Sequence, residues 1–185
     1  MKKNIKRILG KLYCFIFGIK NCGKNVYIGL HSKIVNGNNI EFSNNVSIMP
    51  YNMIVSHGNG KIKIGENSEI GMYSRIASQN SITIEKEVIT GPNIFIADYN
   101  HEYRDIEKPI MEQGNTKEKN EVIIGEGSWI GTNVVIVGNV KIGKHVVIGA
   151  NSVVLKDIAD YSVATGAPAK IVKKYNFNSK KWIKE

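Results

Sequence analysis

Hydrophobic residues recur at every sixth position between Ile124 and Ile158. The first place of successive hexads is held by Ile124, Ile130, Ile136, Ile142, Ile148 and Val154. A six-residue period matches neither the 3.6 residues of an α-helix nor the two-residue alternation of an ordinary strand. It is typical of a β-helix, in which each hexad supplies one short strand and one corner, and three hexads complete one coil. Stacked at about 4.8 Å, such coils bury one continuous column of Ile and Val.

Glycine and asparagine recur at fixed places of these hexads. We expect them at the corners of the coil, because glycine adopts unusual backbone angles at little cost and asparagine tolerates them. The residues concerned are Gly125, Gly131, Gly143, Gly149, Asn133, Asn139 and Asn151. The spacing alone does not decide the hand of the coil, since parallel connections are right-handed in almost every fold.

The same pattern reaches back to Tyr27 and is interrupted once. Aliphatic or aromatic pairs one residue apart mark successive coils, at Ile40 and Phe42, Ile62 and Ile64, Ile82 and Ile84, and Val122 and Ile124. The interval between the last two pairs is about twice the others, and it contains the polar segment 98–121. Loops of this length without structure are uncommon in compact domains and tend to be functional. We therefore predict a β-helix over residues 25–168, with 98–121 as an exposed loop.

Both ends of the chain depart from the hexads. Residues 1–24 begin with aliphatic and basic residues at the spacing of an amphipathic helix. The start resembles a signal peptide, but Lys20 interrupts its apolar part and no clear cleavage site follows. We expect this helix to cap the open end of the β-helix, with contact to a membrane surface as the alternative. Residues 169–185 are rich in lysine, and we expect a basic C-terminal cap.

The formal net charge of +9 and the sequence pI of about 9.4 indicate an anionic partner. Aromatic residues are few and are not interleaved with Lys and Arg, so nucleic acid is disfavoured. No apolar run is long enough to predict a membrane-spanning helix. Cys14 and Cys22 lack metal-ligand spacing and form no disulfide framework. We expect reduced thiols in a cytoplasmic protein, to which we assign no chemistry.

Four histidines are the candidate proton acceptors. His31, His57 and His145 fall in the coils, and we expect each to be an ordinary surface residue. His101 differs because it lies where the polar loop leaves the last regular hexad. Imidazole is the side chain best suited to take a proton near neutral pH. Asp98 or Glu102 would be the neighbouring carboxylate that orients it.

Several motifs occur in a characteristic order along the chain. They are Asp98-Tyr99-Asn100-His101-Glu102-Tyr103-Arg104-Asp105, then Trp129-Ile130-Gly131, then Gly149-Ala150-Asn151-Ser152 with Lys156-Asp157, and finally Gly166-Ala167-Pro168-Ala169-Lys170. In this order they resemble the hexapeptide-repeat acetyltransferases, and most closely the sugar and polysaccharide O-acetyltransferases such as the galactoside, maltose and colanic-acid enzymes. The resemblance covers about residues 60–173. It implies an all-β chain folded as a left-handed parallel β-helix.

The resemblance also implies an activity and an assembly. Acetyl-coenzyme A would lie in a groove between neighbouring subunits of a homotrimer, and no metal would be needed. His101 matches the family's catalytic base, which takes the proton of a sugar hydroxyl during direct transfer. The residues that match the donor site are Gly131, Thr132, Ala150, Leu155, Lys156, Lys170 and Lys173. Leu155 departs from the family pattern, in which Thr is more usual.

The acceptor is poorly encoded in the sequence. Ser78, Asn80, Asn100 and Tyr103 are the expected contacts with a saccharide, since hydroxyl, amide and phenol groups suit a pyranose. Family habit and the basic N-terminus indicate capsule, O-antigen or exopolysaccharide assembly, in the cytoplasm and beside the inner face of the membrane, with a lipid-linked sugar as one possible acceptor.

Three alternatives remain open at this level. N-acetylation of an amino sugar or an antibiotic would use the same base and the same donor groove. A zinc carbonic anhydrase on this scaffold would need closely spaced histidines, which the chain lacks. A non-catalytic repeat protein could present the loop as a binding surface.

Overall fold

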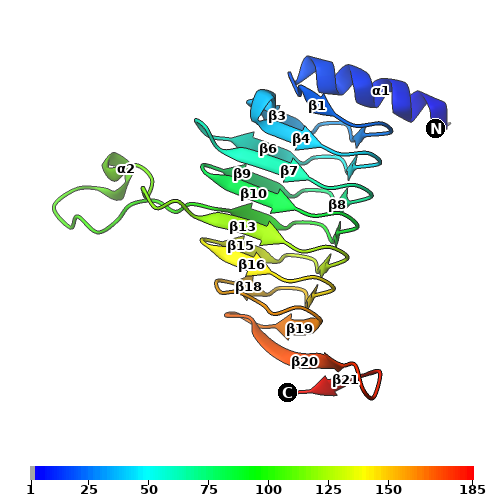
Figure 1. Cartoon of the computed structure of the whole chain (residues 1–185). Helices are drawn as coiled ribbons and strands as arrows, with labels where there is room; N and C mark the ends of the chain where they lie inside the picture. The colour runs from blue at the N-terminus through cyan, green and yellow to red at the C-terminus, as the bar shows by residue number, and fades with distance from the viewer. Residues whose placement is uncertain (1–2) are drawn as a thin grey trace.

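The computed structural model describes residues 3–185, with side chains from Gly10 onward. Figure 1 shows a prism of stacked coils, and every coil contributes a strand to each of three faces. The first face is a six-stranded parallel sheet made of β1 (Asn21–Cys22), β4 (Ile40–Phe42), β7 (Lys61–Ile64), β10 (Ser81–Ile84), β13 (Glu121–Ile124) and β16 (Val140–Ile142).

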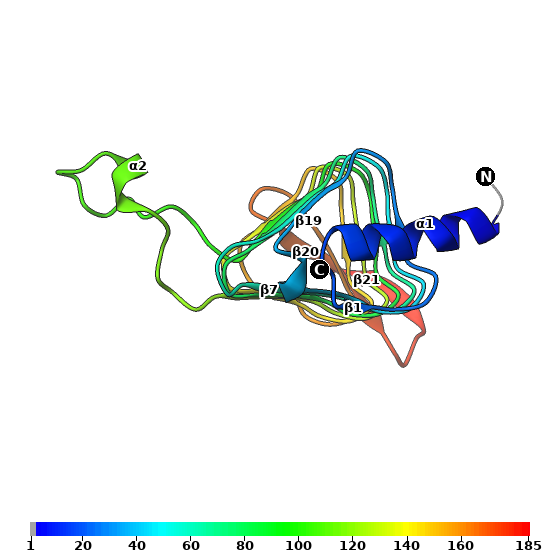
Figure 2. The ribbon, with the colours of Figure 1, turned by 90° about the horizontal axis from the view of Figure 1, so that it is seen from above.

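The second face is a nine-stranded sheet and the third a six-stranded one. The second contains β2 (Tyr27–Ile28), β5 (Ser47–Ile48), β8 (Glu69–Ile70), β11 (Ile89–Thr90), β14 (Trp129–Ile130), β17 (Val147–Ile148), β19 (Ser162–Thr165), β20 (Lys170–Asn176) and β21 (Lys181–Lys184). The third contains β3 (Lys33–Val35), β6 (Met53–Ser56), β9 (Arg75–Ser78), β12 (Phe95–Ala97), β15 (Val135–Val137) and β18 (Val153–Val154). Figures 1 and 2 together show that the coils turn in the left-handed sense, so the predicted fold is confirmed.

The hexad residues fill the interior of the prism, as predicted. Ile84 pairs with Ile124 on the first face, Ile130 with Ile148 on the second, and Ile136 with Val154 on the third. All six of these side chains are at most 1% exposed. One aliphatic side chain per strand therefore builds a column through the molecule, and burial of each contributes roughly 1.5 to 3 kcal/mol.

Left-handed backbone angles at the corners account for the asparagines of the hexads but not for the glycines. Asn133 and Asn151 have left-handed backbone angles, with φ of 58° and 60°, as predicted. At the corner of Asn139 the positive φ falls on Gly138 instead, and the Asn139 side chain accepts a hydrogen bond from the Glu121 amide.

The second-place glycines have no positive φ, so our reason for them was wrong. A Cβ on Gly125 would lie 2.5 Å from the backbone of Gly143 in the next coil, and one on Gly131 would lie 2.7 Å from the nitrogen of Ala150. These positions are glycine because the coils approach too closely for a side chain.

Helix α1 (Lys3–Ile16) lies across the N-terminal end of the prism (Figures 1 and 2). Cys14 and Ile19 are buried in the same hydrophobic cluster as the Ile column, and Tyr13 and Phe17 pack against that cluster. A short 3₁₀ helix, η1 (Gly37–Asn39), follows in an early coil. Helix α1 thus lies where the N-terminal cap was expected, and residues after Gly10 pack on the core. The apolar residues expected before Gly10 lie outside the described side chains.

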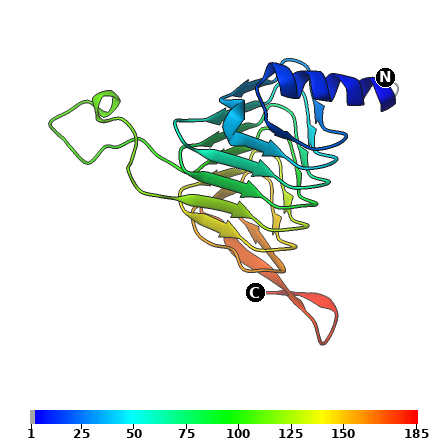
Figure 3. The same ribbon diagram turned by 45° about the horizontal axis from the view of Figure 1, so that its top comes forward.

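The basic tail forms a hairpin that the sequence did not predict as strands. β20 pairs antiparallel with β19, and β21 pairs antiparallel with β20, so the second face continues past the last coil (Figure 3). A turn at Gly166–Ala169 precedes the hairpin, and the amide of Ala169 donates to the carbonyl of Val153. The hairpin and this turn together cover the C-terminal end of the coil.

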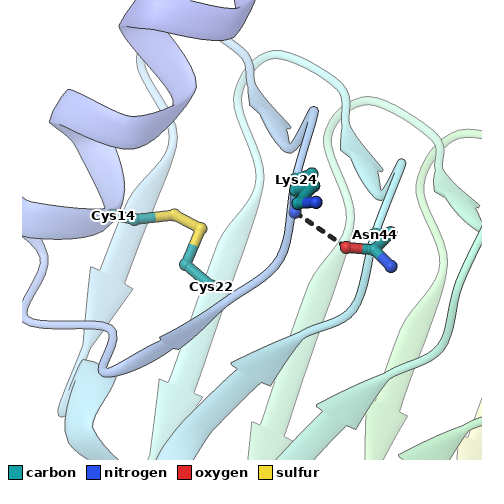
Figure 4. The surroundings of a disulfide bond; sticks show 4 residues. All are labelled: Cys14, Cys22, Lys24 and Asn44. Carbon is teal, nitrogen blue, oxygen red and sulfur yellow. Dashed lines mark hydrogen bonds between the residues drawn. A yellow bond between two sulfur atoms is a disulfide. The ribbon is translucent and has the colours of Figure 1, made fainter.

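The two cysteines form a disulfide between α1 and β1 (Figure 4), so the expectation of reduced thiols is wrong. The chain turns back after the helix at Gly18, which has a φ of 68°. This reversal brings Cys22 beneath Cys14, with 6.4 Å between their Cα atoms. A separation of eight residues in the sequence does not reveal that a helix and a strand lie face to face. The bond fastens the cap to the first coil.

Reduction of this disulfide is expected to loosen α1 while leaving the prism intact. Loop closure alone predicts that the crosslink stabilises the cap by about 2 to 4 kcal/mol. Hydrogen exchange of the α1 amides should therefore accelerate in dithiothreitol, while the amides of β7 to β16 keep their protection. The Cys14→Ala/Cys22→Ala variant is the control, since its exchange should be fast with or without reductant. Unchanged α1 exchange after reduction of the wild type would contradict this role.

Among the described residues, no helix is both long and apolar enough to cross a membrane.

Candidate active site

The polar loop leaves the prism between β12 and β13 and projects far from it (Figures 1 and 2). The coils before and after the loop remain neighbours, because β10 pairs directly with β13 and β12 with β15. The doubled interval in the sequence is therefore one ordinary coil plus the inserted loop. At the base of the loop, His101 bridges Asn115 in antiparallel fashion, and the Thr116 amide donates to the carbonyl of Asn100.

Asp98 anchors the base of this loop. Its side chain is completely buried, and its oxygens accept hydrogen bonds from the Ser78 hydroxyl at 2.6 Å, the Gln79 amide at 2.7 Å and the Asn80 amide at 2.9 Å. Gln79 in turn donates from its side chain to the carbonyl of Thr116 and accepts from the Asn115 side chain. The first residue of the loop is thus bound to the preceding coil, and so is the returning segment at Asn115 and Thr116.

A pocket of about 220 Å³ opens beside this anchor. It is lined by Arg75, Phe95, Ala97, Tyr99, Asn100, His101 and Val137. These residues come from β9, β12 and β15 on the third face and from the start of the loop. Tyr99 is half-buried, and this burial raises the pKa of its phenol, while the nearby Arg75 acts in the opposite direction. The pocket therefore combines a cation, a phenol, an amide and an imidazole on an apolar floor.

His101 is exposed at this pocket, as the sequence predicted for a proton acceptor on the loop. The carboxylates expected to orient it have other partners. Asp98 is engaged by the preceding coil, and Glu102 accepts hydrogen bonds from the side chain and amide of Arg104. The Arg104 guanidinium, which also binds Glu118, lowers the pKa of Glu102 to about 2. Both carboxylates therefore hold the loop in shape instead of contacting the imidazole.

His57 is a residue whose environment the sequence did not reveal. It was expected on the surface, but it is half-buried, and its Nε2 atom is buried without a hydrogen-bond partner among the described residues. Its ring packs edge-on against Tyr99, with the centroids 5.4 Å apart. The contact forms because Tyr99, at the start of the loop, lies against His57 of an earlier coil. His31 and His145 are exposed at corners, as expected, and stack on Tyr51 and Tyr161.

The predicted donor-site residues lie near the two ends of the third face, with Lys170 and Lys173 on the adjoining strand β20 of the second face. Gly131, Thr132 and Ala150 lie at the corner before β15 and β18, where the Thr132 carbonyl accepts from the Asn151 amide. Gly131 contacts the next coil, as its missing Cβ shows, whereas Ala150 is exposed. This corner is separated from Val137 in the His101 pocket by five residues, at most about 17 Å of extended chain.

The second group consists of Leu155 and Lys156, which lie at the same corner as His101. Ile136 pairs with Val154, so Leu155 and Lys156 follow β18 one coil beyond Val137. Leu155 is 52% exposed, and Lys156 is exposed as well. Lys170 and Lys173 are exposed on β20 of the second face. Lys170 pairs with Thr165, which lies over Gly149, so these two lysines are on the side of the Ala150 corner and not of the His101 corner. Among the described residues, none of these three lysines has an acidic partner within salt-bridge distance.

The predicted acceptor residues do not all reach this pocket. Asn100 lines it, and its side chain is exposed. Ser78 is fully buried and donates to Asp98, so our expectation that it contacts a saccharide does not fit the structure. The Asn80 side chain donates to the carbonyl of Glu118, and Tyr103 is 66% exposed farther along the loop. Ser78 and Asn80 thus support the loop base.

Two other features of the molecule do not form a candidate site. A larger hollow of about 370 Å³ lies on the first face between β4, β7 and β10, and it contains none of the predicted site residues. Among the side chains that the structure describes, from Gly10 onward, no three of His, Cys, Asp or Glu are grouped to hold a metal ion. The smaller pocket is therefore the candidate site, because it combines a proton acceptor with polar groups.

The chain is similar to several known proteins. The family model of the bacterial transferase hexapeptide (six repeats) matches residues 121–156. WbbJ of Escherichia coli (strain K12), named as an O-acetyl transferase of lipopolysaccharide biosynthesis, is 38% identical over 107 residues, which is 55% of this chain and 55% of that protein. Galactoside O-acetyltransferase of Lactococcus lactis is 36% identical over 93 residues, 50% of this chain and 43% of that protein. The chain spans about half the length of these relatives.

Solved structures show the same fold over nearly the whole chain. AntD, an N-acyltransferase from Bacillus cereus in complex with dTDP and 3-hydroxybutyryl-CoA, superposes with a TM-score of 0.78 at 23% identity, covering 91% of this chain and 90% of that one. The polySia specific acetyltransferase NeuO superposes with a TM-score of 0.61 at 22% identity, covering 83% and 81%. Residues 121–156 thus match the bacterial transferase hexapeptide within a β-helix, and the resemblance of the chain to the hexapeptide-repeat acetyltransferases is confirmed.

Proposed function

We propose that this chain is an acetyl-coenzyme A-dependent O-acetyltransferase that acts on a hydroxyl group of a saccharide. The observation that carries the proposal is the exposed imidazole of His101, held at a pocket by a loop whose first residue is anchored in the coil. The similarity to O-acetyltransferases of Escherichia coli and Lactococcus lactis supports transfer to oxygen. Assembly of capsule, O-antigen or exopolysaccharide is the setting we propose.

His101 acts as general base in the proposed mechanism. An acceptor hydroxyl in the pocket donates its proton to the imidazole as its oxygen bonds to the acyl carbon, and this proton transfer contributes about 10²- to 10⁴-fold to the rate. The carbon–sulfur bond of the thioester breaks, and the imidazolium gives the proton to the departing thiolate of coenzyme A. Asn100 and Tyr99 hydrogen-bond the sugar and hold the attacking hydroxyl near the imidazole. When bound, acetyl-coenzyme A supplies the acetyl group as a thioester. No covalent intermediate with the protein is required.

Residues near both ends of the third face suit this donor. Leu155 presents an exposed apolar side chain one coil beyond the pocket, where a thin pantetheine arm could pass. Lys156, Lys170 and Lys173 add three ammonium groups that have no carboxylate partner among the described residues. Ammonium groups bind phosphate as point charges, so these lysines would hold the phosphates of the coenzyme.

A homotrimer would join the two groups of donor-site residues. In one chain, Thr132 and Ala150 lie at the far corner of the third face from His101. A second copy packed against this face would bring its own Thr132 corner toward the imidazole. The outward side chains of Met53, Phe95 and Val135 are apolar and only half-buried, which favours such contact.

A transfer assay tests the proposed function directly. The purified chain is incubated with acetyl-coenzyme A and a set of nucleotide sugars and oligosaccharides, and release of coenzyme A is measured for each. We expect release that depends on one class of acceptor and a product labile to mild alkali, as an ester is. No release above background with any saccharide would contradict the proposal.

N-acetylation is the second candidate, favoured by a specific observation. The solved structures with the same fold include AntD and a perosamine N-acetyltransferase from Caulobacter crescentus, both acting at nitrogen by their names. The same imidazole and the same donor residues would serve an amine acceptor. An alkali-stable product formed from an amino sugar would favour this candidate over the O-acetyltransferase.

We further propose that α1 rests on the inner, cytoplasmic surface of a membrane that contains anionic lipid. Leu12, Phe15 and Ile16 are 50%, 84% and 60% exposed on the helix, and Lys11 and Lys20 are exposed nearby. Apolar side chains flanked by lysines suit the boundary between headgroups and acyl chains. The Cys14–Cys22 disulfide is uncommon for that compartment, so the reduced protein is the relevant form for testing this contact.

Binding to vesicles checks this contact. The reduced protein should sediment with vesicles of phosphatidylcholine and phosphatidylglycerol but not with phosphatidylcholine alone. The variant Leu12→Ser/Phe15→Ser/Ile16→Ser should bind at least about 10-fold more weakly, since each buried apolar side chain contributes roughly 1.5 to 3 kcal/mol. Phe177→Ser, at the opposite end of the prism, is the matched control. Equal sedimentation of the triple variant and the wild type would rule out this contact.

A further inference from the structure

Arg75 is a charged residue in a mainly apolar column on the outside of the prism, whose other charged member is the exposed Lys33 at the start of β3. It opens β9 and lies in register with Met53 on β6 and Phe95 on β12. Val135 and Val153 continue the same column on β15 and β18. These four neighbours are half-buried, whereas Arg75 is exposed. The coil therefore accepts apolar side chains at this place, and the packing of the prism does not require a guanidinium there.

No carboxylate of the described chain neutralises Arg75. The guanidinium takes part in none of the ion pairs found among the described residues. Asp98, at the adjoining start of the loop, already accepts three hydrogen bonds from the preceding coil. Glu102 and Glu118 are both bound to Arg104. The positive charge of Arg75 is thus left available to something outside this chain.

The guanidinium lines the same pocket as His101. Tyr99 and Asn100 are the other polar residues there, and Phe95, Ala97 and Val137 form the apolar part. Arg75 is the only Arg or Lys among the residues that line this pocket, and no Asp or Glu lines it. Since the floor is apolar, an anion bound there would be partly shielded from water and would interact more strongly than on an open surface.

We infer that Arg75 binds a negatively charged group of the acceptor, a phosphate or a carboxylate, while His101 takes the proton of a hydroxyl on the same molecule. This inference rests on the proposed transfer reaction and narrows its substrate class to anionic saccharides. The planar guanidinium is suited to both groups, because its parallel N–H donors match two oxygens of either one. Because Arg75 and His101 line one small pocket, binding of the anionic group to Arg75 would determine which hydroxyl of the acceptor lies next to the imidazole.

The experiment compares three acceptors with wild-type, Arg75→Gln and Arg75→Lys chains. UDP-galactose carries a diphosphate, methyl galacturonide a carboxylate, and methyl galactoside neither. Binding is measured by calorimetry without acetyl-coenzyme A, and coenzyme A release is measured separately. Lys61→Gln, which removes an exposed cation from the first face, is the matched control. The sedimentation coefficient of each variant reports whether the oligomeric state has changed.

We expect the wild type to bind at least one anionic acceptor about 10-fold or more tightly than methyl galactoside. Arg75→Gln should weaken that binding by about 10- to 100-fold, with the loss in KM and not in kcat, and should leave methyl galactoside unaffected. Arg75→Lys should restore part of the affinity, and Lys61→Gln should match the wild type. Tighter binding of UDP-galactose or of methyl galacturonide shows whether Arg75 binds a phosphate or a carboxylate of the acceptor.

Other outcomes overturn the inference. Equal affinity of the wild type for all three probes would show that the pocket does not select an anion. Equal losses on charged and neutral acceptors would assign Arg75 a structural role, and a changed sedimentation coefficient would assign it to contact between copies. Arginine-dependent binding without any coenzyme A release would uphold the anion site while contradicting the proposed transfer, so the two failures are distinguishable.

Discussion

Replacing His101 with alanine is expected to reduce kcat/KM for acetyl transfer by at least about 100-fold, and by up to about 10⁴-fold. The imidazole is exposed at the pocket. The carboxylates of Asp98 and Glu102 are hydrogen-bonded to Ser78 and Arg104 and not to the imidazole. Loss of the imidazole removes the proton acceptor, while the donor-site residues at Leu155 and Lys170 are untouched. The measurement is the rate of coenzyme A release at several acceptor concentrations, together with a calorimetric titration of acetyl-coenzyme A.

Two exposed histidines provide the controls for this prediction. His31 and His145 stack on tyrosines at other corners of the prism, and their replacement by alanine should leave the rate unchanged. The His101→Ala chain should still bind acetyl-coenzyme A with wild-type affinity. Turnover that survives in His101→Ala would refute the general-base role, and loss of donor binding would indicate that the variant disturbs the pocket as a whole.

Replacing Asp98 with alanine is expected to lose the activity by releasing the base of the loop. Three hydrogen bonds to a buried carboxylate disappear, each worth roughly 1.5 to 3 kcal/mol. The buried Ser78 hydroxyl and the amides of Gln79 and Asn80 lose their acceptor. We expect ordering of the loop base to become less favourable by at least about 3 kcal/mol, so that His101 no longer stays at the pocket.

Hydrogen exchange separates this positioning effect from general unfolding. In Asp98→Ala the amides of Gln79, Asn80 and Thr116 should exchange faster, while those of β13 to β16 remain protected. Asp105→Asn is the matched control, since Asp105 is an exposed carboxylate of the same loop whose hydrogen bonds stay within it. An Asp98→Ala chain with wild-type turnover and protected Gln79 and Asn80 amides would show that the anchor is unimportant.

The hexad pattern predicted the prism well because the aliphatic residue of each hexad only has to point into the coil that the hexad itself forms. An aliphatic side chain at Ile124 or Ile136 must point inward in any coil of this period, whatever the rest of the chain does. The loop was likewise predictable, because a polar segment cannot supply the buried column. The position of His101 followed from both facts and did not require knowledge of distant contacts.

The features that the sequence failed to reveal all depend on contacts between coils. Ser78 looks like a surface hydroxyl, and only the position of Asp98 one coil later shows that it is buried. His57 is half-buried because Tyr99 returns to it from a later coil. The Cys14–Cys22 disulfide requires the chain to reverse after α1. The glycines were predicted at the right places for the wrong reason, since spacing does not show how closely two backbones approach.

The insertion between β12 and β13 has a consequence for the evolution of such chains. The two ends of this loop meet at the bridge between His101 and Asn115, and the coils on either side pair directly with each other. Substitutions, deletions or wholesale exchange of the residues beyond that junction would therefore leave the prism undisturbed. A lineage could acquire a new specificity by recombining this one segment while inheriting its scaffold unchanged.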